Sequence, residues 1–136
     1  EDILNKEVTI NKILKAHQNV ILKVDIEGDE YKILNQILDN SKKINTLIIE
    51  FHDIHKGINR IGDFINKSKE LKLIHIHANN FAGSNKDGDP NVVELTFINI
   101  NKNELNLVKT DKSFPVKGLD YKNTHRKQDF LLKFND

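Results

Sequence analysis

Acidic, imidazole and amide side chains recur at two-residue intervals at the ends of three apolar runs in this sequence. The three groups are Asp25 and Glu27 after "VILKV", Glu50 and His52 in "TLIIEFH", and His75, His77, Asn79 and the adjacent Asn80 in "LKLIHIHANN". Because residues two apart share one face of a β-strand, each run predicts a column of polar groups. If the three strand ends meet at one edge of a sheet, the columns form a polar cleft.

Taken singly, each of these residues has a simpler interpretation. An acidic residue at a strand end is often only exposed to solvent, and a histidine such as His75 or His77 is often a rim or core residue without a chemical role. Accidental polarity has no reason to select the same end of three strands. The combination therefore predicts a functional cleft.

Such a cleft suits reactions of hydroxyl groups. His77 or His75 could accept a proton near neutral pH. The amides of Asn79 and Asn80 both donate and accept hydrogen bonds, which suits a polyhydroxylated ligand. The carboxylates together with His52 also have the ligand chemistry of a Mg²⁺ or Mn²⁺ site. We favour direct orientation of substrate hydroxyls by these carboxylates over a divalent metal.

The spacing of apolar residues predicts the elements that position these groups. Strands are expected at residues 20–27, 46–52, 71–78 and 92–100, with a short strand near the end of the chain. Helices are expected before the first strand with Thr9 as N-cap, after Asp29 as N-cap, and from about residue 58 to residue 70. This order predicts an α/β fold with three parallel strands and residues 92–100 antiparallel to the third. Ligands bind such sheets at the carboxyl ends of the strands, where the polar columns lie.

Composition limits the classes of function. The 136 residues are 38% hydrophobic and can bury one modest core, so residues 1–136 are expected to form a single domain. A net charge of +1 without a basic block gives no reason to expect a nucleic-acid partner. The absence of cysteine excludes disulfides and thiolate chemistry. With no apolar run long enough for a membrane span and no signal peptide, we expect a soluble, cytoplasmic protein without a membrane partner.

The polar runs resemble a known family. "LKVDIEGDEYKIL", "TLIIEFH" and "HIHANN" followed by "ELTFI" resemble the FkbM-type methyltransferases, whose hallmark is a lysine-x-aspartate-x-glutamate-glycine-x-glutamate run and later strands that end in glutamate and asparagine. The residues that match the first run are Lys23, Asp25, Glu27, Gly28 and Glu30. Glu50, Asn79 and Asn80 match the later strand ends. The resemblance extends over roughly residues 7–100.

The resemblance implies a fold, a cofactor and a set of roles. It implies the C-terminal half of a Rossmann-like class I methyltransferase fold, with parallel strands and a terminal antiparallel hairpin. It also implies S-adenosylmethionine as donor and O-methylation of a small-molecule acceptor such as a sugar or natural product. In that scheme Asp25 and Glu27 face the cofactor, and Asp25 and His77 are catalytic. The acceptor would contact Glu50, His52, His75, Asn79 and Asn80.

The sequence departs from the family at its start. The glycine-rich turn that holds the donor in such enzymes, and the first three strands, do not precede Val20, and the chain has no initiator methionine. We therefore expect the C-terminal part of a longer methyltransferase domain that binds the donor weakly by itself. The free edge of the strand at residues 20–27 would favour a homo-oligomer. A catalytically silent fragment or accessory domain of this fold, and a metal-dependent α/β hydrolase, remain as alternatives.

Overall fold

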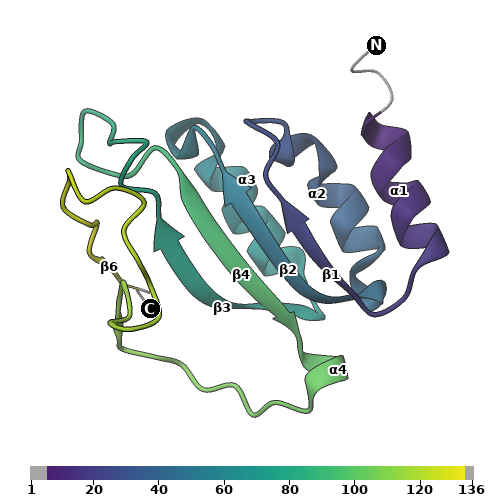
Figure 1. Cartoon of the computed structure of the whole chain (residues 1–136). Helices are drawn as coiled ribbons and strands as arrows, with labels where there is room; N and C mark the ends of the chain where they lie inside the picture. The colour runs from purple at the N-terminus through teal and green to yellow at the C-terminus, as the bar shows by residue number, and fades with distance from the viewer. Residues whose placement is uncertain (1–5, 134–136) are drawn as a thin grey trace.

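The structure, a computed structural model, describes residues 6–133 as a sheet with helices on one face (Figure 1). The elements, in chain order, are α1 (Lys6–Ala16), β1 (Val20–Val24), α2 (Glu30–Asp39), the 3₁₀-helix η2 (Ser41–Lys43), β2 (Ile44–Phe51), α3 (Ile54–Lys67), β3 (Leu71–Ala78), β4 (Val93–Asn99), α4 (Ile100–Asn103), β5 (Ser113–Phe114) and β6 (Leu132–Lys133). The four long strands and the three long helices lie within two residues of the predicted spans at most of their ends. Among the described residues, none of these helices is both long and apolar enough to cross a membrane.

The main sheet is mixed, with strand order β1-β2-β4-β3. β1 is parallel to β2, and β4 is antiparallel to both β2 and β3. The first three strands therefore run in one direction and β4 pairs antiparallel with β3, as predicted. The pairing of β4 with β2 was not predicted: β4 lies between β2 and β3, so the end of β3 is separated from the end of β2 by one strand.

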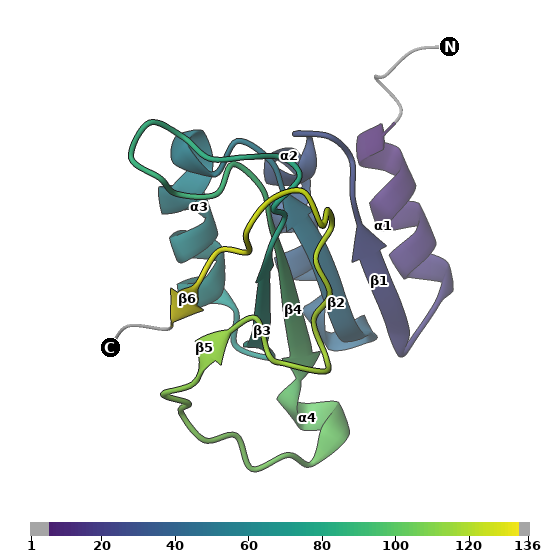
Figure 2. The same cartoon turned by 60° about the vertical axis from the view of Figure 1, so that its left-hand side comes forward.

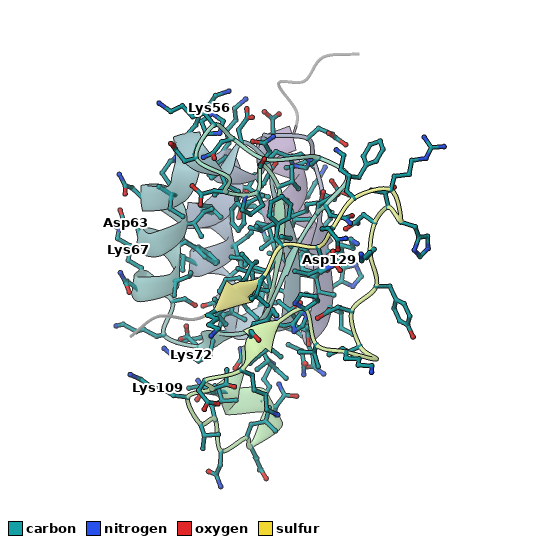
Figure 3. All side chains as sticks on the ribbon, turned by 90° about the vertical axis from the view of Figure 1, so that its left-hand side faces the viewer. Lys56, Asp63, Lys67, Lys72, Lys109 and Asp129 are labelled. Atoms are coloured by element: carbon teal, nitrogen blue, oxygen red, sulfur yellow. The ribbon has the colours of Figure 1, made fainter. Side chains whose placement is uncertain are left out.

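Alternation along the strands separates an apolar face from a polar face. In β2, Leu47, Ile49 and Phe51 are fully buried, and Glu50 points to the opposite face. Figure 1 shows α1, α2 and α3 together on one side of the sheet. There Phe64 of α3 packs edge-to-face on Phe97 of β4, with ring centroids 5.4 Å apart. The outer face of α3 is polar and carries Asp63 and Lys67 (Figure 3).

The polar face of the sheet is partly covered by residues 104–133, here called the C-terminal segment (Figure 2). The short β5–β6 pair belongs to this segment and confirms the predicted terminal strand. His75 on β3 holds the segment in place: its Nε2 atom lies 2.7 Å from Oδ1 of Asp120, and its ring packs edge-to-face on Phe114. One polar contact and one ring contact of His75 thus attach the segment to β3.

Several predicted boundaries were wrong. α3 spans Ile54–Lys67 and not about residue 58 to residue 70. α1 already includes Thr9, so this residue is not an N-cap. β1 ends at Val24 rather than at Glu27, because the chain turns there: Glu27 and Gly28 have φ angles of 55° and 102°, which an extended strand cannot contain. The N–H of Asp29 closes this turn on the carbonyl of Ile26 at 3.3 Å.

Candidate active site

The turn after β1 brings its acidic residues toward the end of β2. Asp25 and Glu27 do not share a strand face, since β1 has ended before them. Both side chains nevertheless lie close to His52, the residue that follows β2. Oxygen atoms of Asp25 and Glu27 and a ring nitrogen of His52 all lie within 4.8 Å of one another. The predicted convergence of these residues is therefore present, although a turn and not a strand produces it.

His52 is fixed at three points by the first two residues of α2. Glu30 is fully buried, and its Oε1 atom accepts hydrogen bonds from the backbone N–H of His52 at 2.7 Å and from ring Nδ1 at 2.8 Å. The Tyr31 hydroxyl donates to the carbonyl of His52 at 2.8 Å. The other Glu30 oxygen accepts from the N–H of Gly28 at 2.7 Å. Glu30 thus joins the turn after β1 to the end of β2, which makes the position of the imidazole rigid.

The remaining ring nitrogen of His52 faces two more carboxylates. Its Nε2 atom lies 3.5 Å from Oε2 of Glu27 and 3.7 Å from Oε1 of Glu50. Burial opposes a positive charge on the ring, but the hydrogen bond and charge of Glu30, with the two carboxylates nearby, outweigh it and raise the pKa of His52 above its ordinary value. We call Asp25, Glu27, Glu30, Glu50 and His52 the His52 cluster.

The third predicted column lies next to this cluster but not within it. Asn79 follows β3 and reaches the cluster, with Nδ2 3.4 Å from Oε1 of Glu50, while its own Oδ1 accepts the N–H groups of the two residues after Asn80. His77 is paired in register with Glu94 of β4, which is in turn paired with Glu50. Nε2 of His77 is buried and has no hydrogen-bond partner in the structure. His77 therefore stands two strands away from β2.

Two other predicted site residues are engaged elsewhere. His75 is held by Asp120, as described above. Asn80 is almost fully buried, and its amide donates to the carbonyls of Thr124 and Lys127 and accepts the N–H of Thr124. Both residues bind the C-terminal segment to the end of β3. Their side chains are occupied by protein partners in this structure.

Sequence reasoning missed Glu94 and the contact that Glu30 makes. Glu94 follows the first residue of β4 and lies between Glu50 and His77 across the sheet, and Nζ of Lys23 is 3.3 Å from its Oε2 atom. The pattern "VVELTF" shows an acid on one strand face, but only the insertion of β4 between β2 and β3 places it at this edge. Glu30 was recognised as part of the resemblance, and its buried contact with His52 was not foreseen.

A comparison with known protein families tests the family resemblance that the sequence motifs suggested. The family model of the methyltransferase FkbM domain matches residues 3–75, more than half of the chain. The chain belongs to the FkbM methyltransferase family. The matched range of the chain includes every residue of the His52 cluster and ends before His77, Asn79 and Asn80. Comparisons of the FkbM domain with curated proteins and with solved structures found no match.

Proposed function

We propose that this FkbM-family protein transfers the methyl group of S-adenosylmethionine to a hydroxyl of a small polyhydroxylated acceptor, such as a sugar or natural product. The observation that carries the proposal is that the family match contains the His52 cluster, the densest group of functional side chains at the carboxyl ends of β1 and β2. The carboxyl edge is where sheets of this kind bind ligands.

The chemistry is a displacement at the sulfonium methyl group. An acceptor oxygen forms a bond to the methyl carbon while the carbon–sulfur bond breaks, and the hydroxyl proton passes to a base or to solvent. Asp25 and Glu27 are exposed on the turn and carry negative charge that attracts the positive sulfonium group. Glu50 and Asn79, whose side chains are 3.4 Å apart, offer an acceptor and a donor for substrate hydroxyls beside His52.

The sheet supports the proposal that these are the later strands of a Rossmann-like class I methyltransferase fold. β1 has a single neighbour among the described strands, so its other edge is available for the earlier strands that the family resemblance implies. The glycine-rich turn expected to hold the donor would belong to those strands. We therefore expect the 136-residue chain to bind S-adenosylmethionine weakly and the intact enzyme to bind it well, which calorimetric titration of both measures.

The decisive experiment is methyl transfer from labelled S-adenosylmethionine to a panel of sugars and polyols by the intact enzyme. Asp25→Asn should lower kcat by about two orders of magnitude, the scale of a lost electrostatic or proton-accepting group, with little change in melting temperature because Asp25 is exposed. Asp63→Asn on the outer face of α3 is the control and should change neither quantity. Near-normal turnover of Asp25→Asn would refute its catalytic role. Metal-dependent phosphatase or nuclease activity without any methyl transfer would instead favour a hydrolase.

A further inference from the structure

We propose that Asp25, Glu27 and His52, with Glu50 beside them, form a binding site for a divalent cation of the Mn²⁺ type. Binding of the ion is inferred from the geometry of these side chains alone, whereas its use in activating an acceptor hydroxyl rests on the proposed methyl transfer. The two parts can fail separately, and the experiment below distinguishes them.

The first argument is the spacing of the donor atoms. The carboxylate oxygens of Glu27 and Glu50 lie 3.5 and 3.7 Å from Nε2 of His52. These separations exceed the usual N–H···O length of about 2.7–3.2 Å. Two ligands that are each about 2.1 Å from one ion and subtend 90–120° are about 3.0–3.6 Å apart. The spacing is therefore closer to that of ligands sharing an ion than to that of a direct hydrogen bond.

The second argument is the orientation of the His52 ring. Glu30 is fully buried and its Oε1 atom lies 2.8 Å from Nδ1, so the ring is held with Nε2 directed toward the carboxylates of Glu27 and Glu50. Glu30 cannot rotate away, because its two oxygens also accept the N–H groups of Gly28 and His52. A buried carboxylate that fixes one ring nitrogen while the other binds a metal is the usual outer partner of a metal-bound histidine.

The third argument is the balance of charge. In the part of the chain that the structure describes, no lysine or arginine forms an ion pair with Asp25, Glu27 or Glu50. Three carboxylates around one imidazole leave net negative charge that a divalent cation neutralises. Hard oxygen ligands favour Mg²⁺, Mn²⁺ or Ca²⁺, and an imidazole ligand favours Mn²⁺ within this group.

The exposure of the ligands gives the ion a function. Asp25 is exposed and the Glu27 side chain is 86% exposed, so water or an acceptor hydroxyl can reach coordination positions that the protein leaves open. A hydroxyl bound to a divalent ion loses its proton more readily, and its oxygen is held in place for attack on a methyl group. His52 then acts as a ligand and not as the proton acceptor.

The test is titration of Mn²⁺ into the 136-residue chain, with no donor or acceptor present, followed by the electron paramagnetic resonance signal of free Mn²⁺. We expect saturable binding of one ion, weakened at least tenfold in Glu27→Gln and in Asp25→Asn and unchanged in Asp63→Asn. Both altered residues are exposed, so these variants should melt as the unaltered chain does. Pulsed measurements of the bound ion should also show coupling to a nitrogen nucleus, as expected for an imidazole ligand.

The outcomes separate this inference from the proposed function. Saturable binding that depends on Asp25 and Glu27 supports the cation site even if the intact enzyme transfers no methyl group. No saturable binding up to about 1 mM, where weak carboxylate sites bind, or equal binding by all variants, overturns it. Methyl transfer that persists in excess chelator, together with absent binding, would leave His52 as a metal-free proton acceptor held by Glu30.

Discussion

Replacement of Glu30 by glutamine tests whether the buried carboxylate holds the site together. The carboxylate accepts three hydrogen bonds, from the N–H of Gly28 and from the N–H and ring Nδ1 of His52. Glutamine is nearly the same size but has one oxygen, so its NH₂ group must face one of these donors. Either the turn after β1 or the end of β2 loses its partner.

The magnitude follows from the bonds that are lost. A hydrogen bond to a charged group contributes about 1.5–3 kcal/mol, and a buried donor left unpaired costs about 1–3 kcal/mol. Part of this cost is offset, because the variant no longer buries a charge. We expect a net destabilisation of about 2–4 kcal/mol, which for a chain of this length corresponds to a fall in melting temperature of about 10 °C.

The assay is thermal and urea unfolding of Glu30→Gln beside Glu27→Gln. Glu27→Gln is the same chemical change at a side chain three residues away that is 86% exposed. The free energy of unfolding of this variant should differ from that of the unaltered chain by less than about 0.5 kcal/mol. If both variants melted within about 2 °C of the unaltered chain, the hydrogen bonds of Glu30 would not be what positions His52, and the argument for a fixed imidazole would fail.

Three further predictions concern the surroundings of the site. Gly57→Ala should destabilise the fold by about 1–3 kcal/mol because the added methyl group meets the ring of Tyr31, whereas Gly62→Ala in the same helix meets nothing and should stabilise by about 0.5–1 kcal/mol. Burial, with nearby carboxylates, raises the pKa of Tyr31 to about 12, so stability should be complete below pH 10 and should fall as the pH rises toward 12. Asn80→Ala should cost about 2–3 kcal/mol and speed proteolysis of the C-terminal segment, as measured by mass spectrometry of the fragments.

Each of these predictions has a result that contradicts it. Equal effects of the two glycine substitutions would mean that helix propensity, and not contact with Tyr31, decides the outcome at residue 57. An alkaline unfolding curve that is the same in Tyr31→Phe as in the unaltered chain would remove Tyr31 from the pH dependence, and Tyr121→Phe is the control because that side chain is 78% exposed. Unchanged proteolysis of Asn80→Ala would show that its hydrogen bonds do not retain the segment.

The elements were predictable because apolar periodicity is a local property. In α2, Ile33, Leu34 and Ile37 follow helical spacing and are all buried. In β2 the alternate residues Leu47 and Ile49 are buried against the helices. Such patterns depend only on neighbours along the chain, so a sequence shows them directly.

The order of strands and the construction of the site were less predictable. The local sequence of β4 does not indicate that this strand pairs with β2 as well as with β3. Pairing between strands that are distant in the sequence depends on the assembly of the whole sheet. The turn at Glu27 uses a backbone conformation that glutamate rarely adopts, and local patterns therefore favoured a longer strand. Complete burial of Glu30 became visible only when its partners from the turn and from β2 were in place.

The site residues also divide into those that local sequence patterns predicted and those that depend on long-range contacts. Asp25 and Glu27 follow β1, and Glu50 and His52 lie at the end of β2. They converge because these two parallel strands are adjacent, which the β-α-β order predicts. His77 is farther away because β4 intervenes. Asn80 and His75 looked like ligand-binding groups, but residues more than forty positions later in the chain bind them. Contacts over such sequence separations have no local signal.

The position of β4 also has a consequence for how the protein is made. Within the described sheet β3 has no partner other than β4, although β3 is synthesised first. At ordinary translation rates the stretch between the end of β2 and the end of β4 takes about 2–10 s to emerge. During that interval the nascent chain carries an open edge on β2 and two open edges on β3, which other chains can pair with. The open edge of β2 and one edge of β3 are therefore closed by the same strand, and only after Asn99 has left the ribosome.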